Sequence, residues 1–298
     1  MLLEKIINDF AAENGMITGI CGGGPICDKK KFHNAKTPFV KYSAEERANP
    51  RLTMPECKSI IVAGLGYKKK HAFNDDGAPR GVLSQGAIGT DYHITIKKRL
   101  AELAANLLNH KEFKFIIFAD DGPLAERELL VRAGLGWRGK NGLVISERFG
   151  SFFNAGYMMT DLEMECVDKI IEPKCGNCRL CVNACPGALN GGDFEYGKCV
   201  SFLTQKKGVL NEDEKKAMGL NLYGCDACQD VCPFNESVAA EEITDIEAAK
   251  PELTGLVKIT KYDFRRKYVD SALYWRGVIN LRRNAGIALK NYYDEKSV

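Results

Sequence analysis

"CGNCRLCVNACP" at residues 175–186 places four cysteines in twelve positions, and a proline follows the last of them. A second motif, "CDACQDVCP" at residues 225–233, repeats the closing Cys-Pro with two cysteines ahead of it. Thiolates are soft ligands that suit iron–sulfur clusters, and a CxxCxxC turn places three sulfurs around one cluster. The cysteine before the proline ligates the other cluster of a pair. The two motifs therefore predict two interleaved 4Fe–4S clusters.

The second motif needs one more ligand, and Cys199 lies between the motifs. The predicted ligands of one cluster are Cys175, Cys178, Cys181 and Cys232. Those of the other are Cys185, Cys199, Cys225 and Cys228. Structural zinc is the alternative, because CxxC pairs also bind zinc, but zinc does not require two interleaved Cys-Pro motifs. The remaining cysteines are predicted to be core or surface residues: Cys21, Cys27, Cys57 and Cys166.

The composition is that of an ordinary globular protein, with 298 residues, 45% hydrophobic and 27% charged. No apolar run approaches the length of about 18 residues that a membrane span needs. The opening "MLLEKIINDFAAENG" carries acidic residues within its apolar run, which favours an amphipathic first helix over a signal peptide. We therefore expect a cytoplasmic protein without membrane contact, in which cysteines stay free of disulfides.

Strand and helix patterns alternate ahead of the cysteine motifs. Apolar runs at 59–67, 113–120, 142–146 and 152–160 predict strands. Between the first two, Ile96, Leu100, Leu103 and Leu107 recur at helical spacing. A second helix is predicted after residue 120, with Pro123 in its first turn and Gly134 just past its end. This alternation predicts an α/β (α+β) domain.

Three domains are expected from these patterns. They are an α/β domain at 1–165, a ferredoxin-like two-cluster domain at 166–240 and a short C-terminal helical segment at 241–298. The acidic stretch 237–250 is predicted to be a surface connector. "CGGGP" at 21–25 lacks the Lys-Ser/Thr of a phosphate loop and predicts a tight turn.

Asp120 stands at the end of the strand predicted at 113–120. In open α/β sheets, ligands bind outside the carboxyl ends of the strands. A carboxyl group at that place is positioned for general acid catalysis. The neighbouring Asp121 is predicted to be a residue that starts the following helix.

Several longer motifs resemble those of the epoxyqueuosine reductase family. "DDGPLAERELLVRAGLGWRGKNGLVI" (120–145) resembles the longest of the family's motifs, and "GTDYH" (89–93) and "KCVSFLTQKKG" (198–208) resemble two more. "DFRRKYVDSALYWRGVINLRRNAGIAL" (263–289) looks like the linker into the family's last domain. The resemblance covers nearly the whole chain, and its motifs are long enough to be specific.

The resemblance implies a cobalamin-dependent enzyme that reduces the epoxide of epoxyqueuosine in the anticodon loop of tRNA. By that resemblance, the first domain binds cobalamin and Asp120 is the proton donor. An external donor such as flavodoxin or ferredoxin feeds the clusters. The corrinoid would be lined by Tyr92, Lys140, Asn141, Ser201 and Thr204. The family's cobalt takes no protein histidine, so His93 is not expected to be a cobalt ligand. Burial is expected to raise the pKa of Asp120.

The sequence departs from the family pattern in two places. Typical members continue as HEAT-like repeats that help to bind tRNA, and the sequence ends at Val298, where the repeats would begin. The family's Ser-Arg-Tyr ahead of the Gly-x-Asp-Tyr-His motif is replaced by "LSQGAI" (83–88). Both departures concern substrate recognition, so we expect the redox chemistry to be better determined than the substrate.

Three functions are compatible with these observations. The first is the reductase of epoxyqueuosine in tRNA, with the basic segment 261–290 contacting phosphates. That segment holds eight basic residues against two acids, and a solvated helix face is its alternative explanation. The second function is a related cobalamin reductase of a small molecule, as in reductive dehalogenases. The third is an electron carrier, which would leave Asp120 and the Gly-Leu-Gly-Trp-x-Gly-Lys-Asn run unexplained.

Overall fold

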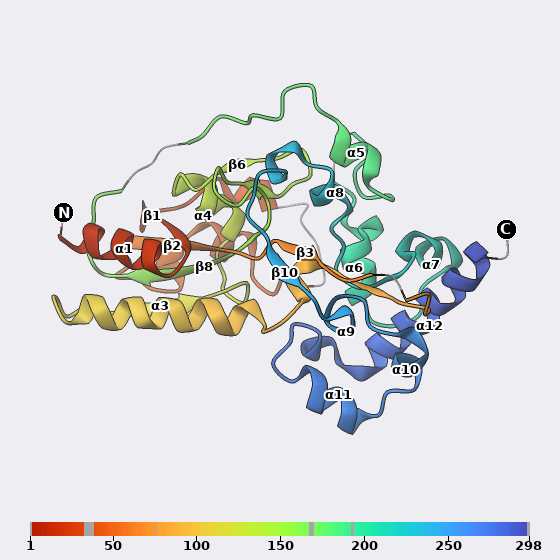
Figure 1. Ribbon diagram of the computed structural model, residues 1–298. Helices are drawn as coiled ribbons and strands as arrows, with labels where there is room; N and C mark the ends of the chain where they lie inside the picture. The colour runs from red at the N-terminus through yellow and green to blue at the C-terminus, as the bar shows by residue number, and fades with distance from the viewer. Residues whose placement is uncertain (1, 33–38, 75, 167–169, 192–193, 297–298) are drawn as a thin grey trace. The chain divides into compact units, whose positions relative to one another are not determined.

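The computed structural model describes residues 2–32, 39–74, 76–166, 170–191 and 194–296. The chain forms two compact units, each built from two segments (Figure 1). The first unit comprises Met1–Gly66 and Tyr92–Cys178, and the second comprises Tyr67–Asp91 and Arg179–Val298. The three domains expected from the sequence remain a prediction.

A four-stranded sheet forms the centre of the first unit. Its strands are β1 (Met16–Gly22), β2 (Ser59–Gly66), β8 (Phe153–Thr160) and β5 (Phe115–Phe118), in that order across the sheet. Each neighbouring pair is antiparallel. The mixed α/β content is as predicted, but the rule that places ligands at the carboxyl ends of parallel strands does not apply to this sheet.

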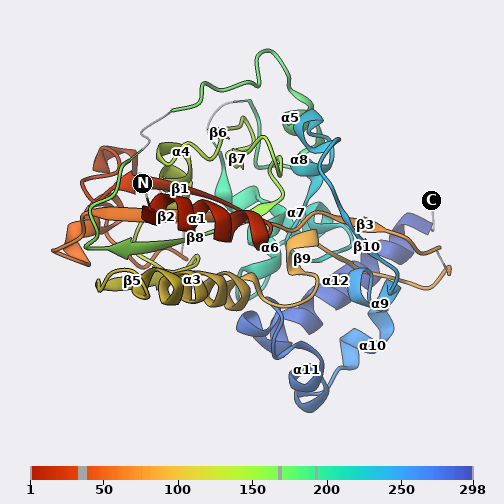
Figure 2. The ribbon, with the colours of Figure 1, turned by 60° about the vertical axis from the view of Figure 1, so that its left-hand side comes forward.

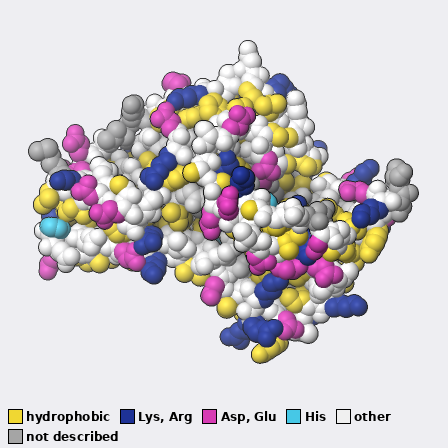
Figure 3. Space-filling model, in the orientation of Figure 1, with side chains coloured by type: hydrophobic (Ala, Val, Ile, Leu, Met, Phe, Trp, Pro, Cys, Tyr) yellow, Lys and Arg dark blue, Asp and Glu magenta, His cyan; other side chains and the backbone are white. Residues whose placement is uncertain are grey.

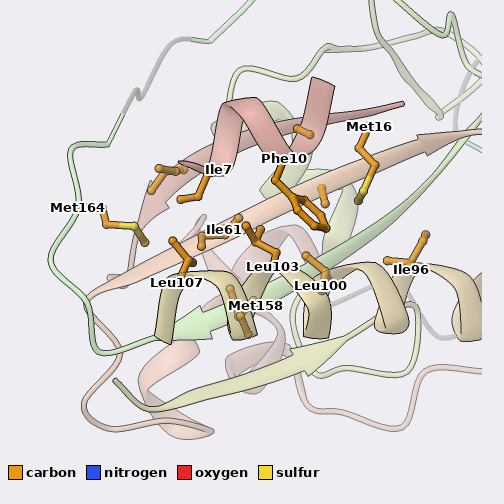
Figure 4. Packing of buried hydrophobic residues seen from close by; sticks show 14 of the residues in the cluster. Ile7, Phe10, Met16, Ile61, Ile96, Leu100, Leu103, Leu107, Met158 and Met164 are labelled. Atoms are coloured by element: carbon orange, nitrogen blue, oxygen red, sulfur yellow. The ribbon is translucent and has the colours of Figure 1, made fainter. Parts of the chain in front are cut away.

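The two faces of the sheet carry separate hydrophobic cores. Along β2, Ile61 and Ala63 belong to one core, while Ile60 and Val62 belong to the other, as the two-residue repeat of a strand requires. Helices α1 (Leu2–Glu13) and α3 (Tyr92–Leu108) cover the first face, shown in Figure 4. Helix α4 (Glu126–Arg132) covers the second. The unit is therefore layered helix–sheet–helix.

The predicted apolar stripe of α3 is confirmed. Its residues Ile96, Leu100, Leu103 and Leu107 are all buried and point toward the sheet (Figure 4). The strand predicted at 113–120 is shorter than expected and lies at the edge of the sheet. Because β5 pairs with β8 alone, Phe115 and Ile116 remain partly exposed.

Helix α4 begins later than predicted. Pro123 does not lie in its first turn, because the helix starts at Glu126 and residues 119–125 form a loop. Tertiary hydrogen bonds account for the delay. The Leu124 N–H donates to the Tyr157 hydroxyl at 3.1 Å and the Ala125 N–H donates to the Arg47 carbonyl at 3.1 Å. Gly134 follows the helix with φ of +69°, as its predicted place past the end requires.

Short elements complete the first unit. They are α2 (Ala44–Ala48), the 3₁₀ helices η1 (Lys29–Phe32) and η2 (Pro50–Leu52), and the hairpin of β6 (Trp137–Arg138) with β7 (Val144–Ile145). The predicted turn at 21–25 follows β1. A side chain at Gly23 would lie 2.4 Å from the Cys57 carbonyl oxygen, so this close approach needs glycine.

The second unit joins residues that are far apart in sequence through two small parallel pairs. Strand β3 (Lys69–His71) pairs with β10 (Glu241–Ile243), and β4 (Val82–Leu83) pairs with β9 (Asn221–Tyr223). The acidic connector predicted at 237–250 is therefore structured in part. It contains β10 and α9 (Ile246–Ala249), and Ala249 is fully buried.

Helices form most of the second unit (Figures 1 and 2). In chain order they are η3 (Gln85–Ala87), α5 (Leu180–Ala184), η4 (Tyr196–Lys198), α6 (Val200–Gln205), α7 (Glu212–Met218), α8 (Ala227–Asp230), η5 (Pro233–Asn235), α9, α10 (Leu253–Lys258), α11 (Lys261–Tyr268), η6 (Tyr274–Arg276) and α12 (Gly277–Lys296). The helical character predicted from Tyr262 onward is confirmed. Helices α10, α11 and α12 share a core with β4 and β9. Among the described residues, α12 included, no helix is long and apolar enough to span a membrane.

Candidate active site and cluster motifs

Asp120 lies in the loop between β5 and α4, and its backbone is unusual. Its φ of +59° makes it the one non-glycine residue with positive φ in the described part of the chain. Aspartate tolerates this left-handed conformation better than most residues, but the conformation is still strained. Such strain is common at functional sites.

The Asp120 carboxylate is presented to solvent and contacts two aromatic rings. The Tyr92 hydroxyl donates a hydrogen bond to Asp120 Oδ2 at 2.7 Å, and His93 Nε2 lies 3.9 Å from the same oxygen. The two rings stack with centroids 4.1 Å apart. The Asp120 side chain is 63% exposed, so the burial expected from the sequence is wrong for the protein alone.

Asp121 does not start the helix, and that prediction is wrong. It lies five residues before α4, and its Oδ1 accepts a hydrogen bond from the Ala119 N–H at 3.2 Å. Its other oxygen pairs with Lys97. Burial would raise the pKa of Asp121, but these hydrogen bonds outweigh it and the pKa is lowered. Asp121 therefore remains ionised and stabilises the loop through these two contacts.

Glu126 is a site residue that the sequence analysis missed. Its Oε1 accepts a hydrogen bond from the Asp120 N–H at 2.6 Å. Burial raises the pKa of Glu126 well above its usual range, and the nearby charge of Asp120 raises it further. The sequence offered one signal, a third carboxylic acid that follows Asp120 and Asp121 at position 126.

Lys140 and Asn141 lie in the turn between β6 and β7. The Lys140 ammonium donates to the Gly176 carbonyl at 2.6 Å and to the Cys178 carbonyl at 3.0 Å. Both carbonyls belong to the loop of the first cysteine motif. Asn141 is buried, and its Oδ1 accepts the Leu143 N–H at 3.1 Å, which shapes the turn. Contact of either residue with a corrinoid remains a prediction.

Two arginines that the sequence left unassigned have structural contacts. Arg127 donates to the Gly142 carbonyl at 3.2 Å and so supports the same turn. Arg132 donates to the carbonyls of Gly24 and Pro25, at 3.3 and 2.8 Å. These bonds tie α4 to the turns on either side of it.

Ser201 and Thr204 lie in the second unit, on α6. Thr204 is fully buried. Its hydroxyl donates to the Ser201 carbonyl at 2.9 Å and accepts the Gly224 N–H at 3.0 Å. Its carbonyl accepts hydrogen bonds from Asn280 and Asn284 of α12, at 2.8 and 2.7 Å. Thr204 thus holds α6 to the segment just before Cys225, and Ser201 is the less buried of the two.

One predicted cluster has the ligands Cys185, Cys199, Cys225 and Cys228, and the thiols of these residues affect one another electrostatically. Burial is the main cause that raises the pKa of Cys225 to about 11, and the charges of Cys199 and Cys185 raise it further. Burial likewise raises the pKa of Cys228, with the charges of Cys225, Cys199 and Cys185, and of Cys181 from the other predicted set, adding to the effect. The four thiols that the spacing assigns to one cluster are therefore neighbours within the second unit.

The other predicted ligands are divided between the units. Cys175 and Cys178 end the first unit, where the Cys178 N–H donates to the Cys175 carbonyl at 3.0 Å. Cys181 lies on α5, and Cys232 follows α8, both in the second unit. All twelve cysteines are free thiols. Among the described side chains, no group of three or more is arranged around a single metal ion.

Residues 67–91 brace the second motif from within the second unit. The Gln85 N–H donates to Asp226 Oδ2 at 2.6 Å, and burial raises the pKa of Asp226 to about 6. The Lys68 ammonium donates to the Asn235 carbonyl and, at 3.0 Å, to the Val238 carbonyl. These contacts were not predicted, because they join segments separated by more than a hundred residues.

Two family models match the chain. The model described as "Epoxyqueuosine reductase QueG, DUF1730" matches residues 47–121, and the "4Fe-4S double cluster binding domain" matches residues 174–235. A curated epoxyqueuosine reductase from Bacillus cereus is 38% identical over 275 residues, which cover 89% of this chain and 72% of that protein. The chain belongs to the epoxyqueuosine reductase family.

Solved epoxyqueuosine reductases share the fold. The structure from Streptococcus thermophilus has a TM-score of 0.92 and 32% identity, over all of this chain and 83% of that one. Two others, each 31% identical, cover 99% of this chain and 82% of their own. One was solved with an epoxyqueuosine-modified tRNA-Tyr stem loop, with a TM-score of 0.89. The other, from Bacillus subtilis, has its catalytic loop swung out of the active site, with a TM-score of 0.88.

Membership of the epoxyqueuosine reductase family confirms the resemblance drawn from the motifs and makes the protein an oxidoreductase. The double-cluster match spans all eight predicted cysteine ligands and confirms two 4Fe–4S clusters as cofactors. The donor set fits these clusters, because the eight residues are free thiols, seven from the two motifs and Cys199 from the segment between them. The division of the ligands between the clusters remains a prediction.

Proposed function

We propose that this protein reduces epoxyqueuosine to queuosine in tRNA. The observation that carries the proposal is the exposed carboxyl of Asp120, held on a strained loop beside Tyr92 in a chain of this family. A solved relative that carries an epoxyqueuosine-modified stem loop supports tRNA as the substrate. Removal of an epoxide oxygen as water consumes two electrons and two protons, so the enzyme needs both a reductant and an acid.

Asp120 is the proposed acid. Its carboxyl is exposed, so an epoxide oxygen can reach it without any rearrangement of the core. The Tyr92 hydroxyl, 2.7 Å away, orients the carboxyl and leaves its other oxygen available for the substrate. Bound substrate and cofactor would exclude water from Asp120, and a dry environment favours the protonated form of a carboxyl group.

Cobalamin, the cofactor of this family, would supply the nucleophilic reducing centre when bound. The residues present fit a corrinoid that takes no imidazole from the protein. His93 is stacked on Tyr92 and faces the Asp120 carboxylate, so its ring already has partners. The proposed contacts are those that the family resemblance implies: Tyr92, Asp120, Lys140, Asn141, Ser201 and Thr204. Flavodoxin or ferredoxin is the proposed external electron donor.

The proposed tRNA surface is narrower than the predicted basic segment 261–290. On α11, Lys261, Arg265, Arg266 and Lys267 are exposed, and dark blue side chains gather over this helix in Figure 3. Phosphate contacts from such residues supply much of the affinity for nucleic acid.

Two arginines of the segment have structural roles instead. Arg282 donates from Nε to the Ile259 carbonyl at 2.7 Å. Arg283 donates to the carbonyls of Lys206 and Gly208, at 2.5 and 2.8 Å. Since these bonds hold α12 to its neighbours, we assign phosphate binding to α11 and not to Arg282 or Arg283.

The decisive experiment is anaerobic reconstitution with iron, sulfide and cobalamin, followed by incubation with tRNA that carries epoxyqueuosine. We expect queuosine to appear in the digested tRNA, as measured by mass spectrometry, and to require a low-potential reductant. A reconstituted enzyme that is reduced normally but leaves the tRNA unchanged would contradict the proposal and favour a small-molecule substrate.

A further inference from the structure

Hydrogen bonds hold the loop that carries Asp120 at both of its ends. Downstream, the N–H groups of Leu124 and Ala125 are bonded to the Tyr157 hydroxyl and the Arg47 carbonyl. Upstream, the Ala119 N–H is bonded to Asp121, which in turn pairs with Lys97. Between these anchors, Asp120 adopts its left-handed conformation.

Glu126 supplies a contact to the strained residue itself. The Asp120 N–H donates to Glu126 Oε1 at 2.6 Å, a short hydrogen bond that closes the loop from its first residues to the start of α4. This bond fixes the backbone at Asp120 while its side chain points the other way, to Tyr92.

The contact is not an ordinary helix-start interaction. In a capping box, a Glu at the third helical position bonds to the N–H of the N-cap residue. Here Glu126 is the first helical residue, the N-cap is Ala125, and Ala125 has no side-chain cap. The Glu126 carboxyl passes over its own helix start and reaches a residue five positions before the N-cap. A role confined to the stability of α4 would not require that geometry.

We propose that Glu126 is a positioning residue that holds Asp120 in its left-handed conformation and so keeps the Asp120 carboxyl at Tyr92. The inference rests on the proposed function for the role of Asp120 as the acid. The hydrogen bond from the Asp120 N–H to Glu126, which we call the clamp, is a property of the folded protein whatever its substrate. Release of this bond would free the loop to leave Tyr92.

The surroundings of Glu126 favour its protonated form. Burial of Glu126 and the charge of Asp120 both raise the pKa of Glu126, so the two carboxyls do not both carry a charge at low cost. Asp121 opposes ionisation of Glu126 further, and Arg127 favours it. Either protonation state of Glu126 retains an oxygen that can accept the Asp120 N–H.

Two substitutions of Glu126 distinguish the clamp from a role of its charge or its bulk. Glu126→Gln keeps an oxygen acceptor at the same reach and removes the charge, whereas Glu126→Leu keeps similar bulk and removes the acceptor. The measurement is hydrogen exchange by mass spectrometry on the anaerobically reconstituted holoenzyme, for peptides covering residues 119–124 and, as an internal reference, α3.

We expect Glu126→Leu to speed exchange in 119–124 by about tenfold, as loss of the acceptor for the Asp120 N–H implies, with α3 unchanged. Glu126→Gln should stay within about threefold of the wild type, because its amide oxygen restores the bond. Unchanged exchange in the leucine variant, or equally fast exchange in both variants, overturns the clamp. If leucine also speeds exchange in α3, Glu126→Ala replaces it and is judged by the same criterion.

Turnover of tRNA gives a second readout. Glu126→Leu should lower kcat about 10- to 100-fold with KM for tRNA little changed, because a displaced acid affects the chemical step more than binding. Glu126→Gln should retain most of kcat. Equal losses in the two variants would contradict the proposal. If the wild type fails to act on tRNA while the exchange pattern appears as expected, the proposed function fails and the clamp stands.

Discussion

At the scale of single residues, the loop 119–125 and the start of α4 give three carboxyl groups three environments. Asp120 is exposed and bonded to Tyr92, Asp121 is paired with Lys97, and Glu126 is buried against the Asp120 backbone. Environment, rather than residue type, decides which carboxyl can deliver a proton. The exposed one can touch a substrate, the paired one stays ionised, and the buried one supports its neighbour.

Asp120→Asn should keep both clusters and abolish most turnover. The change is nearly isosteric and removes the transferable proton, and general acid catalysis contributes about 10²- to 10⁴-fold to rate. The measurement is single-turnover conversion of epoxyqueuosine in tRNA, together with iron content. Asp121→Asn is the matched control, because it keeps an acceptor for the Ala119 N–H and loses only its charge pair with Lys97. A variant at position 120 with near-normal rate would refute the assignment.

Cys199→Ala should damage one cluster, and Cys166→Ala should damage neither. Cys199 is electrostatically coupled to Cys225 and Cys228, whereas the Cys166 thiol donates to the Met164 carbonyl at 3.4 Å in the first unit. The wild type should hold about eight irons, and Cys199→Ala about half of them. Iron analysis and low-temperature electron paramagnetic resonance decide the matter. Equal iron loss in the two variants would show that the ligand assignment is wrong.

At the scale of elements, the β6–β7 turn is linked to the loop of the first cysteine motif through Lys140. Its ammonium donates to the carbonyls of Gly176 and Cys178, which belong to that motif. Cluster potentials depend on net charge and hydrogen bonding nearby. A cation at this position stabilises the reduced, more negative cluster.

Lys140→Met should therefore lower the reduction potential of one cluster by an amount on the order of tens of millivolts. Iron content should remain near that of the wild type. The matched control is Lys114→Met, which removes a surface cation that pairs with Glu56 at 3.2 Å. A redox titration followed by electron paramagnetic resonance measures both variants. An equal shift in the two variants would indicate a general charge effect rather than the Lys140 contact.

The elements differ in how far the sequence could predict them. The buried apolar stripe of α3 could be predicted, because Ile96, Leu100 and Leu103 recur at the spacing of one helix face and this pattern is local in the sequence. The start of α4 could not, because the N–H groups of Leu124 and Ala125 bond to distant partners. The two 4Fe–4S clusters could be predicted from the spacing of the cysteines, whereas the individual ligands remain a prediction. Glu126 was not, because its role depends on the backbone conformation of another residue.

At the scale of the whole molecule, the net charge of only +3 does not indicate a nucleic-acid partner. Its distribution matters more, because α11 presents several cations while Arg282 and Arg283 are used for structure. Exposed cations on one helix form the electrostatic footprint expected for a nucleic-acid partner. The sequence could predict the local excess of charge but not which residues were available.

Reversal of Arg265, Arg266 and Lys267 to glutamate should weaken tRNA binding and flatten its salt dependence. Each phosphate contact contributes to the slope, so the loss of three should reduce its magnitude by about 2–3. Binding is measured by fluorescence anisotropy across a salt series. Reversal of Lys98, Lys111 and Lys114 changes the net charge equally on exposed positions of the first unit and is the control. Equal effects of both triple variants would contradict a binding surface on α11.

Pairing of β3 with β10 sets an order of events during synthesis. Lys69 lies opposite Glu241, so the ribosome makes one strand long before its partner exists. Chains fold as they emerge only where the required contacts are already present. Strand β4 is likewise synthesised long before β9, with which it pairs. Leu83 cannot be buried in its core until Leu222 and Leu253 have been synthesised. The last two cysteines of the second motif are therefore translated before the unit around them can close. We therefore expect iron delivery to follow the synthesis of β10 and of Leu253.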